Sequence, residues 1–315
     1  MALSSLLDRR LVIVTGKGGV GKSTVAASLA LRASRAGKRV LVCETNVFER
    51  IAPLLGAPPS GSTAREVRQN LFSVDVTPSA AMREYGVMIL RWKTLYDAVF
   101  ENRLMRYFLG AVPGLAELVI LGKVLHEVKV LDEGAPRWDM VILDAPATGH
   151  AVQLLRVPAA LIDTVPAGPL RHDAEWMQAI LVDPVRTGLV IVTLPEEMPV
   201  NEAIDLDAQV RDLLHIPRTA LVVNAMPTSR FTPAEREALA PWESAPPPLG
   251  PAVRAATLQA HHAENAQRDL ARARAAIDLP TLVLPLLALP IWGPEAVERL
   301  AAELGRTADR AGAAA

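Results

Sequence analysis

The chain of 315 residues is half hydrophobic and can bury a large core, either as one α/β domain or as two domains. Its formal net charge is −1 and its arginines are scattered, which argues against nucleic acid as its main partner, because proteins that bind nucleic acid usually carry a clustered basic face. The single cysteine, Cys43, excludes an internal disulfide framework and suits a reducing compartment.

Two stretches were considered for targeting or for membrane insertion. The six residues before Leu7 are too few for a signal peptide. The most apolar late stretch, residues 279–292, contains three prolines and is too short to span a bilayer. We therefore expect a cytoplasmic protein.

A glycine-rich segment, residues 16–24, follows an apolar run and precedes a helix-forming run, which is the context that a phosphate-binding loop requires. Its glycines let successive backbone N–H groups point inward, and the next helix adds the positive end of its dipole. Lys22 is placed to reach the β- and γ-phosphates, and the Ser23 hydroxyl to bind Mg²⁺. The residues expected to contact the nucleotide here are Gly16, Lys17, Gly18, Gly19, Val20, Gly21, Lys22, Ser23 and Thr24.

Lys17, directly after the first glycine, is not needed to hold phosphates within one chain. The loop resembles the deviant loop of dimeric ATPases such as the nitrogenase iron protein, MinD, ParA and the arsenite-pump ATPase. That resemblance implies that Lys17 crosses a dimer interface and does the work of an arginine finger, which can be worth about 10³–10⁵ in rate. The alternative is a solvated surface lysine, although only six lysines occur in the chain and two lie in this loop.

The second predicted strand, residues 39–43, is followed by Glu44. Ligands of open parallel sheets lie beyond the carboxyl ends of the strands, so Glu44 is placed to orient the attacking water. The alternative is an acid that supports the site without touching the water, or a surface acid. Cys43 beside it is interpreted as a small buried apolar residue.

Residues 82–131 form a helical region that is rich in aromatic residues and methionine. This region is either the packed core of a helical lobe or an apolar groove for a hydrophobic client, because methionine suits adaptable binding surfaces. Periodicity does not separate the two interpretations.

Asp144 follows the buried-strand run 140–143 and is the expected acidic partner of the loop, holding Mg²⁺ directly or through water, with a strand-end cap as the alternative. The segment 145–150 that follows is suited to be a switch ordered by ATP. We interpret His150 as structural rather than as a catalytic base. His261 and His262 are interpreted as solvated surface, because they lack metal-ligand partners at usable spacing.

Further strands are predicted over residues 71–76, 189–194, 220–223 and 281–284, with a helix over 251–277 that packs on one side. Strands alternating with helices predict an α/β fold, a doubly wound, mostly parallel sheet of the P-loop NTPase type with an inserted α-helical subdomain. We expect one P-loop ATPase domain over residues 1–315, with helical insertions over 78–136 and 228–278. A disordered tail is expected over 305–315.

Several motifs together resemble the ArsA family, which includes the arsenite-pump ATPase and the guided-entry ATPase that targets tail-anchored proteins. The loop at 16–24 is similar to that family's loop, and residues 144–150 look like its Asp-Thr-Ala-Pro-Thr-Gly-His switch. The strand-end asparagine that contacts adenine in the family is matched by Val222-Val223-Asn224. The element before the helix that leads into the switch is resembled by Pro113-Gly114 with Glu117. The closing loop and last helix of the family look like residues 285–300. The resemblance runs along nearly the whole chain.

The resemblance implies a dimer that closes around ATP, with a helical subdomain whose shape follows the nucleotide state. It implies that Lys22, Ser23 and Asp144 surround phosphate and Mg²⁺, that Lys17 acts across the interface, and that Asn224 contacts the base.

The chain departs from the family at the first switch, where Glu44-Thr45-Asn46-Val47 stands in place of Asp-Pro-Ala-His. The longer side chain moves the carboxylate by about 1 Å, and such a misplacement can reduce a rate ~10²-fold. An arsenite pump is not expected, because activation by arsenite needs several cysteines. There is also no Cys-x-x-Cys pair for the zinc site of the eukaryotic targeting dimer.

These observations predict a dimeric switch of the ArsA family that hydrolyses ATP to ADP and phosphate with Mg²⁺, with Lys17, Lys22, Glu44 and Asp144 as catalytic residues. Its helical lobe is expected to engage a hydrophobic protein or a membrane-associated partner, which would make it peripheral to a membrane. The oligomer is a homodimer or a heterodimer with a paralogous ATPase. The alternative function is a weakly active or inactive subunit of a hetero-oligomer whose partner supplies the missing aspartate.

Overall fold

A computed structural model describes residues 6–45, 48–90 and 114–313 of the chain. Its centre is an eight-stranded sheet, in the order β10-β9-β8-β1-β7-β2-β4-β3, in which β3 is antiparallel to β4 and the other described pairs are parallel. The strands are β1 (Leu11–Gly16), β2 (Val40–Glu44), β3 (Arg65–Arg68), β4 (Leu71–Asp75), β7 (Met140–Ala147), β8 (Thr187–Thr193), β9 (Arg218–Met226) and β10 (Thr281–Pro285).

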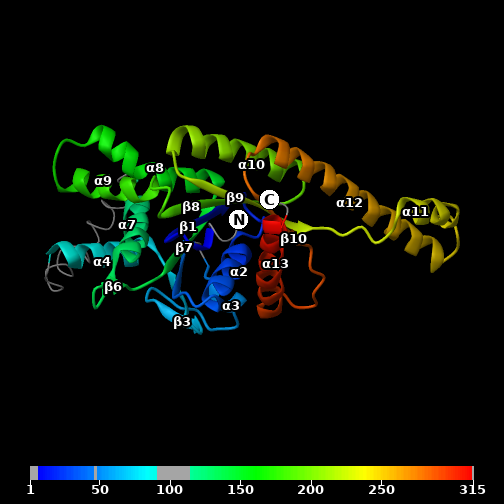
Figure 1. Cartoon of the computed structure of the whole chain (residues 1–315), viewed down its shortest axis with the longest axis horizontal. Helices are drawn as coiled ribbons and strands as arrows, with labels where there is room; N and C mark the ends of the chain where they lie inside the picture. Colours follow the sequence, from blue (N-terminus) through cyan, green and yellow to red (C-terminus); the bar gives the residue numbers. More distant parts are fainter. Residues whose placement is uncertain (1–5, 46–47, 91–113, 314–315) are drawn as a thin grey trace.

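The inner strands are continuous apolar runs, because a parallel sheet is covered by helices on both faces. One core lies between the sheet and α2 (Lys22–Arg35), α3 (Ile51–Leu54) and α13 (Pro294–Ala313). The other lies between the sheet and α7 (Leu115–Lys129), α8 (Thr148–Thr164), α9 (Pro169–Leu181), α10 (Glu197–Gln209) and α12 (Leu249–Ala276). Figure 1 shows the two helical layers above and below the sheet. The predicted doubly wound α/β fold is confirmed.

The first helical region is described at its two ends, by α4 (Pro78–Leu90) and α7, which pack against each other. Leu118, Leu121, Leu125 and Val128 on α7 are all buried in the core, and the short hairpin of β5 (Leu131–Asp132) and β6 (Ala135–Pro136) follows. Residues 91–113, which carry most of the predicted aromatic groove, lie outside the described residues. None of the described helices combines the length and the apolar character needed to cross a membrane.

The helix α12 has 28 residues and projects from the sheet, with α11 (Pro233–Leu239) and the 3-10 turn η2 (Ala240–Trp242) at its far end (Figure 1). The side chains that it buries recur at helical spacing and include Val253, Ala260, Ala263 and Leu270. The predicted helix over 251–277, packed on one side, is therefore confirmed.

The end of the chain corrects one prediction. The helix α13 continues to Ala313, so residues 305–313 are helical rather than a disordered tail. Its buried residues Ala296, Val297, Leu300, Ala301 and Leu304 recur at helical spacing and pack beside α2. This apolar stripe anchors the first part of α13 against α2.

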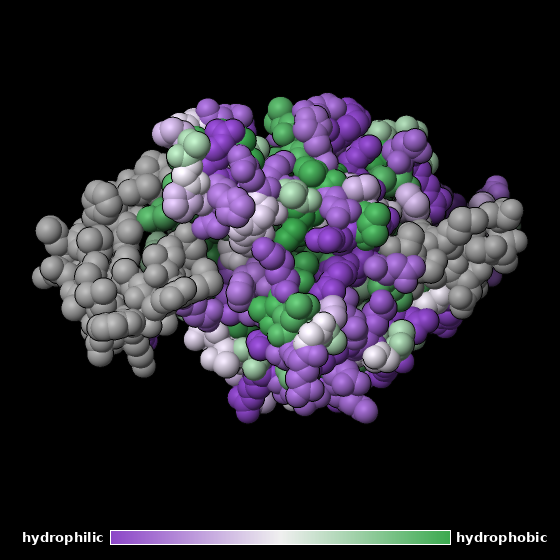
Figure 2. Space-filling model, turned by 60° about the vertical axis from the view of Figure 1, so that its left-hand side comes forward, coloured by the Kyte–Doolittle hydropathy of each residue, from purple (hydrophilic) through white to green (hydrophobic). Residues whose placement is uncertain are grey.

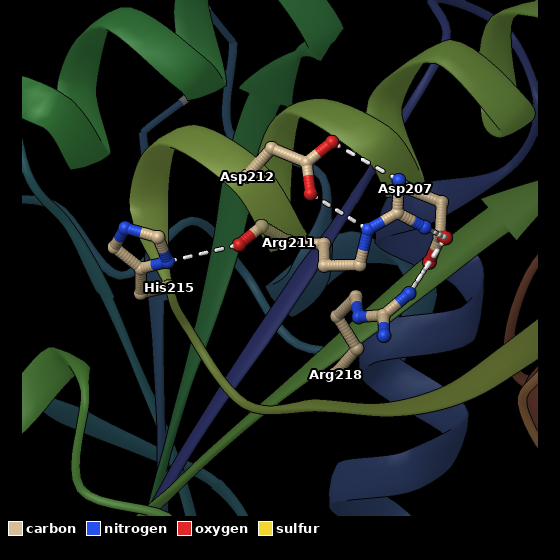
Figure 3. Close-up of polar contacts among 5 residues, drawn as sticks. All are labelled: Asp207, Arg211, Asp212, His215 and Arg218. Carbon is tan, nitrogen blue, oxygen red and sulfur yellow. Dashed lines mark hydrogen bonds and ion pairs between the residues drawn. The ribbon is translucent and has the colours of Figure 1, made fainter.

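The far end of α10 is fixed to the start of β9 by a polar network (Figure 3). The carboxylate of Asp207 is buried and accepts two hydrogen bonds from Arg218, at 2.7 and 2.6 Å. Arg211 lies 3.9 Å from the same carboxylate and pairs with the exposed Asp212. His215, which follows the π-helical turn η1 (Val210–Leu214), lies within hydrogen-bond distance of the carbonyl oxygen of Arg211.

We predict that Asp207→Ala lowers the free energy of unfolding by about 3 kcal/mol, because it leaves the Arg218 guanidinium largely buried and without its counter-charge. Urea unfolding followed by circular dichroism measures this change. The matched control is Asp212→Ala, which removes an exposed ion pair of the same network and should leave the free energy of unfolding close to that of the wild type. Equal losses in the two variants would contradict this assignment.

Candidate nucleotide-binding site

The backbone of the loop between β1 and α2 requires glycine at three points. Gly19 and Gly21 have φ angles of 87° and 89°, in the left-handed region that glycine tolerates. A Cβ atom on Gly16 would lie 2.1 Å from the carbonyl oxygen of Val192, and one on Gly21 would lie 2.4 Å from the Asn224 amide nitrogen. The loop is therefore held tightly by β8 and β9, at the N-terminus of α2, where backbone N–H groups favour anions.

Lys22 is the first residue of α2, and its side chain folds back onto the loop. Its Nζ atom donates a 3.0 Å hydrogen bond to the carbonyl oxygen of Lys17. Burial lowers the pKa of Lys22, and the nearby Asp144 carboxylate opposes that shift. The ammonium group is thus already inside the loop, where the sequence predicts that it meets phosphate.

Ser23 and Asp144 come together although 121 positions separate them in the sequence. The Ser23 hydroxyl donates a 2.6 Å hydrogen bond to Oδ2 of Asp144, which is fully buried. The parallel pairing of β1 with β7 places them together, because it sets Asp144 level with Val14, just before the loop. This contact brings Asp144 to the loop, and its role in holding Mg²⁺ stays a prediction.

The oxygen atoms of Ser23 and Asp144 are ligands of the kind that Mg²⁺ prefers. No group of three or more His, Cys, Asp or Glu residues suited to a metal occurs in the described ranges. The hydroxyl of Ser23 and the carboxylate of Asp144 fit a Mg²⁺ that arrives with a nucleotide and shares its phosphates.

Glu44 ends β2, and its carboxylate faces α3. It accepts hydrogen bonds from the backbone N–H groups of Arg50 and, at 3.1 Å, of Ile51. Only 2% of the surface of Glu44 is exposed, and this burial raises the pKa of its carboxyl group to about 7. The two backbone hydrogen bonds lower the pKa, whereas the nearby charges of Asp144 and Glu49 raise it further. These contacts match an acid that supports the site from behind better than one aimed at water.

Three acids stand in one row at the carboxyl edge of the sheet. The strand register sets Glu44 level with Asp144 on one side and with Asp75 on the other. Burial raises the pKa of Asp75, and the neighbouring Glu49 raises it further. Sequence reasoning overlooked Asp75, which ends β4.

Asn224 and Lys17 occupy two sides of the loop. The Asn224 amide donates a 2.9 Å hydrogen bond to the carbonyl oxygen of Val20, so it braces the loop in the described structure. The Lys17 ammonium forms a 2.6 Å ion pair with Glu202 on α10. Glu202 was not predicted, because only the parallel pairing of β8 beside β1 brings the start of α10 to this loop.

Three further interpretations can be compared with the structure. Cys43 is completely buried, and burial raises the pKa of its thiol, so it packs as a small apolar residue as expected. His150 is exposed at the first turn of α8, and His261 and His262 are exposed on α12. The predicted surface position of the histidine pair is confirmed.

Comparison with known proteins gives one consistent result. The family described as "Anion-transporting ATPase" matches residues 9–166. "ATPase BagA" of Mycobacterium tuberculosis (strain ATCC 25618 / H37Rv) is 31% identical over 316 aligned positions, which cover 91% of this chain and 88% of the relative. "ATPase GET3" of Kluyveromyces lactis is 30% identical over 171 positions, and "ATPase get3" of Schizosaccharomyces japonicus is 30% identical over 164. These two alignments cover 50% of this chain and 49% and 48% of the relatives.

We predict that Glu44 makes the nucleotide-free protein less stable as the pH rises. Between about pH 4.5 and pH 7 the folded protein keeps a proton on Glu44 that the unfolded chain has released, so stability falls through this window and the loss is complete above it. Relative to Glu44→Gln, the wild type should lose up to about 3 kcal/mol between pH 4.5 and pH 8.

The measurement is urea unfolding of both proteins across this pH range. The difference between the two proteins removes the contribution of the other titrating acids. A difference that is constant with pH would mean that Glu44 titrates as an ordinary exposed acid.

Proposed function

We propose that this chain, which belongs to the ArsA family of anion-transporting ATPases, is a dimeric switch in which two copies close around ATP. As a member of that family it binds nucleotide and is an ATPase. The hydrolysis of ATP to ADP and phosphate would take place at the loop between β1 and α2, with Mg²⁺.

Lys17 carries the proposal of a dimer. Its side chain turns away from its own loop to Glu202 and is 32% exposed, while its backbone carbonyl oxygen binds Lys22. Lys22 is therefore the lysine placed to serve the chain's own phosphates, and Lys17 is left available to a second copy. In that role Lys17 would neutralise charge that develops on the transferred phosphoryl group.

Exposed apolar side chains at the same edge of the sheet support the proposal. Phe48 follows β2, Met198 lies in the first turn of α10, and Ile291 and Trp292 follow β10; their exposed fractions run from 50% to 79%. Phe48 and Met198 come soon after the carboxyl ends of β2 and β8, on the side of the nucleotide loop. Apolar groups gathered near a functional edge favour contact with another protein surface.

In the proposed reaction the backbone N–H groups of the loop hold the phosphates, and Lys22 neutralises the β- and γ-phosphates. Ser23 and Asp144 would hold Mg²⁺, which supplies further neutralisation of the phosphate charge. Asn224 would exchange its hydrogen bond to Val20 for one to the base. Glu44 would keep α3 in place beneath the segment that follows β2.

We further propose that the nucleotide state is passed to a protein or membrane-associated partner through the helical lobe. The apolar face of α7 that carries Leu118, Leu121, Leu125 and Val128 is buried, so a partner would meet the lobe elsewhere. In Figure 2 the apolar residues of the face in view form a broken column between hydrophilic ones. A partner that binds this face would therefore have to match polar and apolar groups together.

A second candidate function is a weakly active or inactive subunit whose paralogous partner supplies the aspartate of the first switch. The contacts of Glu44 favour it, because both of its oxygen atoms are engaged by the backbone at Arg50 and Ile51. Such a carboxylate is less free to orient water in its own subunit.

We predict that Lys17→Ala reduces kcat about 10³-fold or more while leaving ATP binding intact, because the lysine is needed in the second copy's site. Lys22→Ala should abolish both binding and turnover. Phosphate release and light scattering with and without Mg²⁺–ATP measure these effects. Lys38→Ala, a lysine just before β2 at the opposite edge of the sheet, is the control and should behave as wild type. Unchanged turnover in Lys17→Ala would exclude the trans role.

The second candidate predicts a gain from Glu44→Asp, because the shorter side chain restores the carboxylate position of the family's aspartate. Turnover of the isolated protein should then rise up to about 100-fold. Steady-state phosphate release measures it, with Glu49→Asp as a control for an acid on the neighbouring loop. A turnover unchanged by Glu44→Asp would count against the hetero-oligomer.

A further inference from the structure

The ion pair between Lys17 and Glu202 joins the nucleotide loop to α10. Lys17 Nζ lies 2.6 Å from Glu202 Oε1, and both side chains are about one third exposed. Nothing in a phosphate-binding loop demands this contact, because the loop already binds Lys22 through the carbonyl oxygen of Lys17. The contact therefore decides only where the Lys17 ammonium lies.

Glu202 stands on a helix that is anchored at both ends. At the far end, Asp207 is paired with Arg218 (Figure 3). At the near end, Arg272 of α12 donates 2.9 Å hydrogen bonds to Oδ1 of Asn201 and to the carbonyl oxygen of Glu197. Because α10 is fixed on both sides of Glu202, the helix does not have to move for the pair to open, and rotation of the two side chains is enough.

We propose that Glu202 is a positioning residue that holds Lys17 within its own protomer until ATP and a second copy are both present. This inference rests on the proposed dimeric ATPase and adds a residue that regulates it. Lysine has a flexible four-carbon stem and can change partner by rotation, without movement of the loop. The γ-phosphate of the ATP bound to a second copy carries more negative charge than a carboxylate. It therefore competes with Glu202 for the Lys17 ammonium group.

The size of the effect follows from the exposure of the pair. A partly exposed ion pair changes an equilibrium by about 1.5- to 5-fold. A symmetric dimer has to open two such pairs, so Glu202→Gln should tighten ATP-dependent self-association about 2- to 30-fold. The ion pair between Lys17 and Glu202 is thus weak enough to open when ATP is bound, and strong enough to reduce self-association in its absence.

The first experiment measures self-association by light scattering, and phosphate release, across a range of protein concentrations. With Mg²⁺–ATP, Glu202→Gln should reach half-maximal turnover at a lower protein concentration than wild type. Asp205→Asn is the matched control, because Asp205 is an exposed acid on the same helix without a hydrogen bond or ion pair among the described residues. In a Lys17→Ala background Glu202→Gln should have no further effect. A loss of self-association in Glu202→Gln would overturn the proposal and place Glu202 across the interface.

A second measurement needs no ATPase activity. The rate at which acetic anhydride modifies Lys17 in nucleotide-free protein, followed by mass spectrometry, should rise several-fold in Glu202→Gln and not in Asp205→Asn. An unchanged rate would show that the pair does not restrain Lys17 and would overturn the proposal. A raised rate without turnover or self-association in any variant would instead defeat the proposed function, and the inference with it.

Discussion

The parallel register of β1 between β7 and β8 is the constraint on which the rest of the site depends. It places Asp144 beside the loop, so that Ser23 can donate to it at 2.6 Å. On the other side it places the start of α10 beside the loop, so that Glu202 reaches Lys17. A shift of one residue in the pairing of β7 with β1 would turn the Asp144 side chain to the opposite face of the sheet. The apolar strands that fix the register therefore also fix the chemistry.

The features of the fold and the site that depend on short-range sequence patterns could be predicted from the sequence. The strand, glycine-rich loop and helix around residues 16–24, the apolar run that precedes Asp144 and the one-sided packing of α12 all follow from short-range rules. Glu202 and Asp75 could not be found in this way, because their roles depend on which strands are neighbours in the sheet. The sequence pattern also did not predict that α13 continues to Ala313.

Glu44 shows how one methylene group changes the use of an acid. The strand register brings it level with Asp144, and in that crowded position a second buried charge is unfavourable. Two backbone N–H groups at the start of α3 donate hydrogen bonds to this carboxylate, and these bonds offset part of the cost of burying its charge. Both oxygen atoms of the Glu44 carboxylate therefore bind the backbone at the start of α3 and hold it in place. Any hydrolysis at this site has to rely on positioning and charge neutralisation more than on Glu44 as a base.

The two lysines of the loop share a residue type and differ in surroundings. Lys22 is buried and tied to the loop, so its charge is committed to whatever anion the loop holds. Lys17 is partly exposed and tied to a neighbouring helix by a single ion pair, so its charge can be redirected at small energetic cost. A loop that needed only to bind nucleotide would gain nothing from the second lysine. A switch that couples ATP binding to the assembly of two copies requires such a division, in which Lys22 binds the phosphates of its own chain and Lys17 stays available to the second copy.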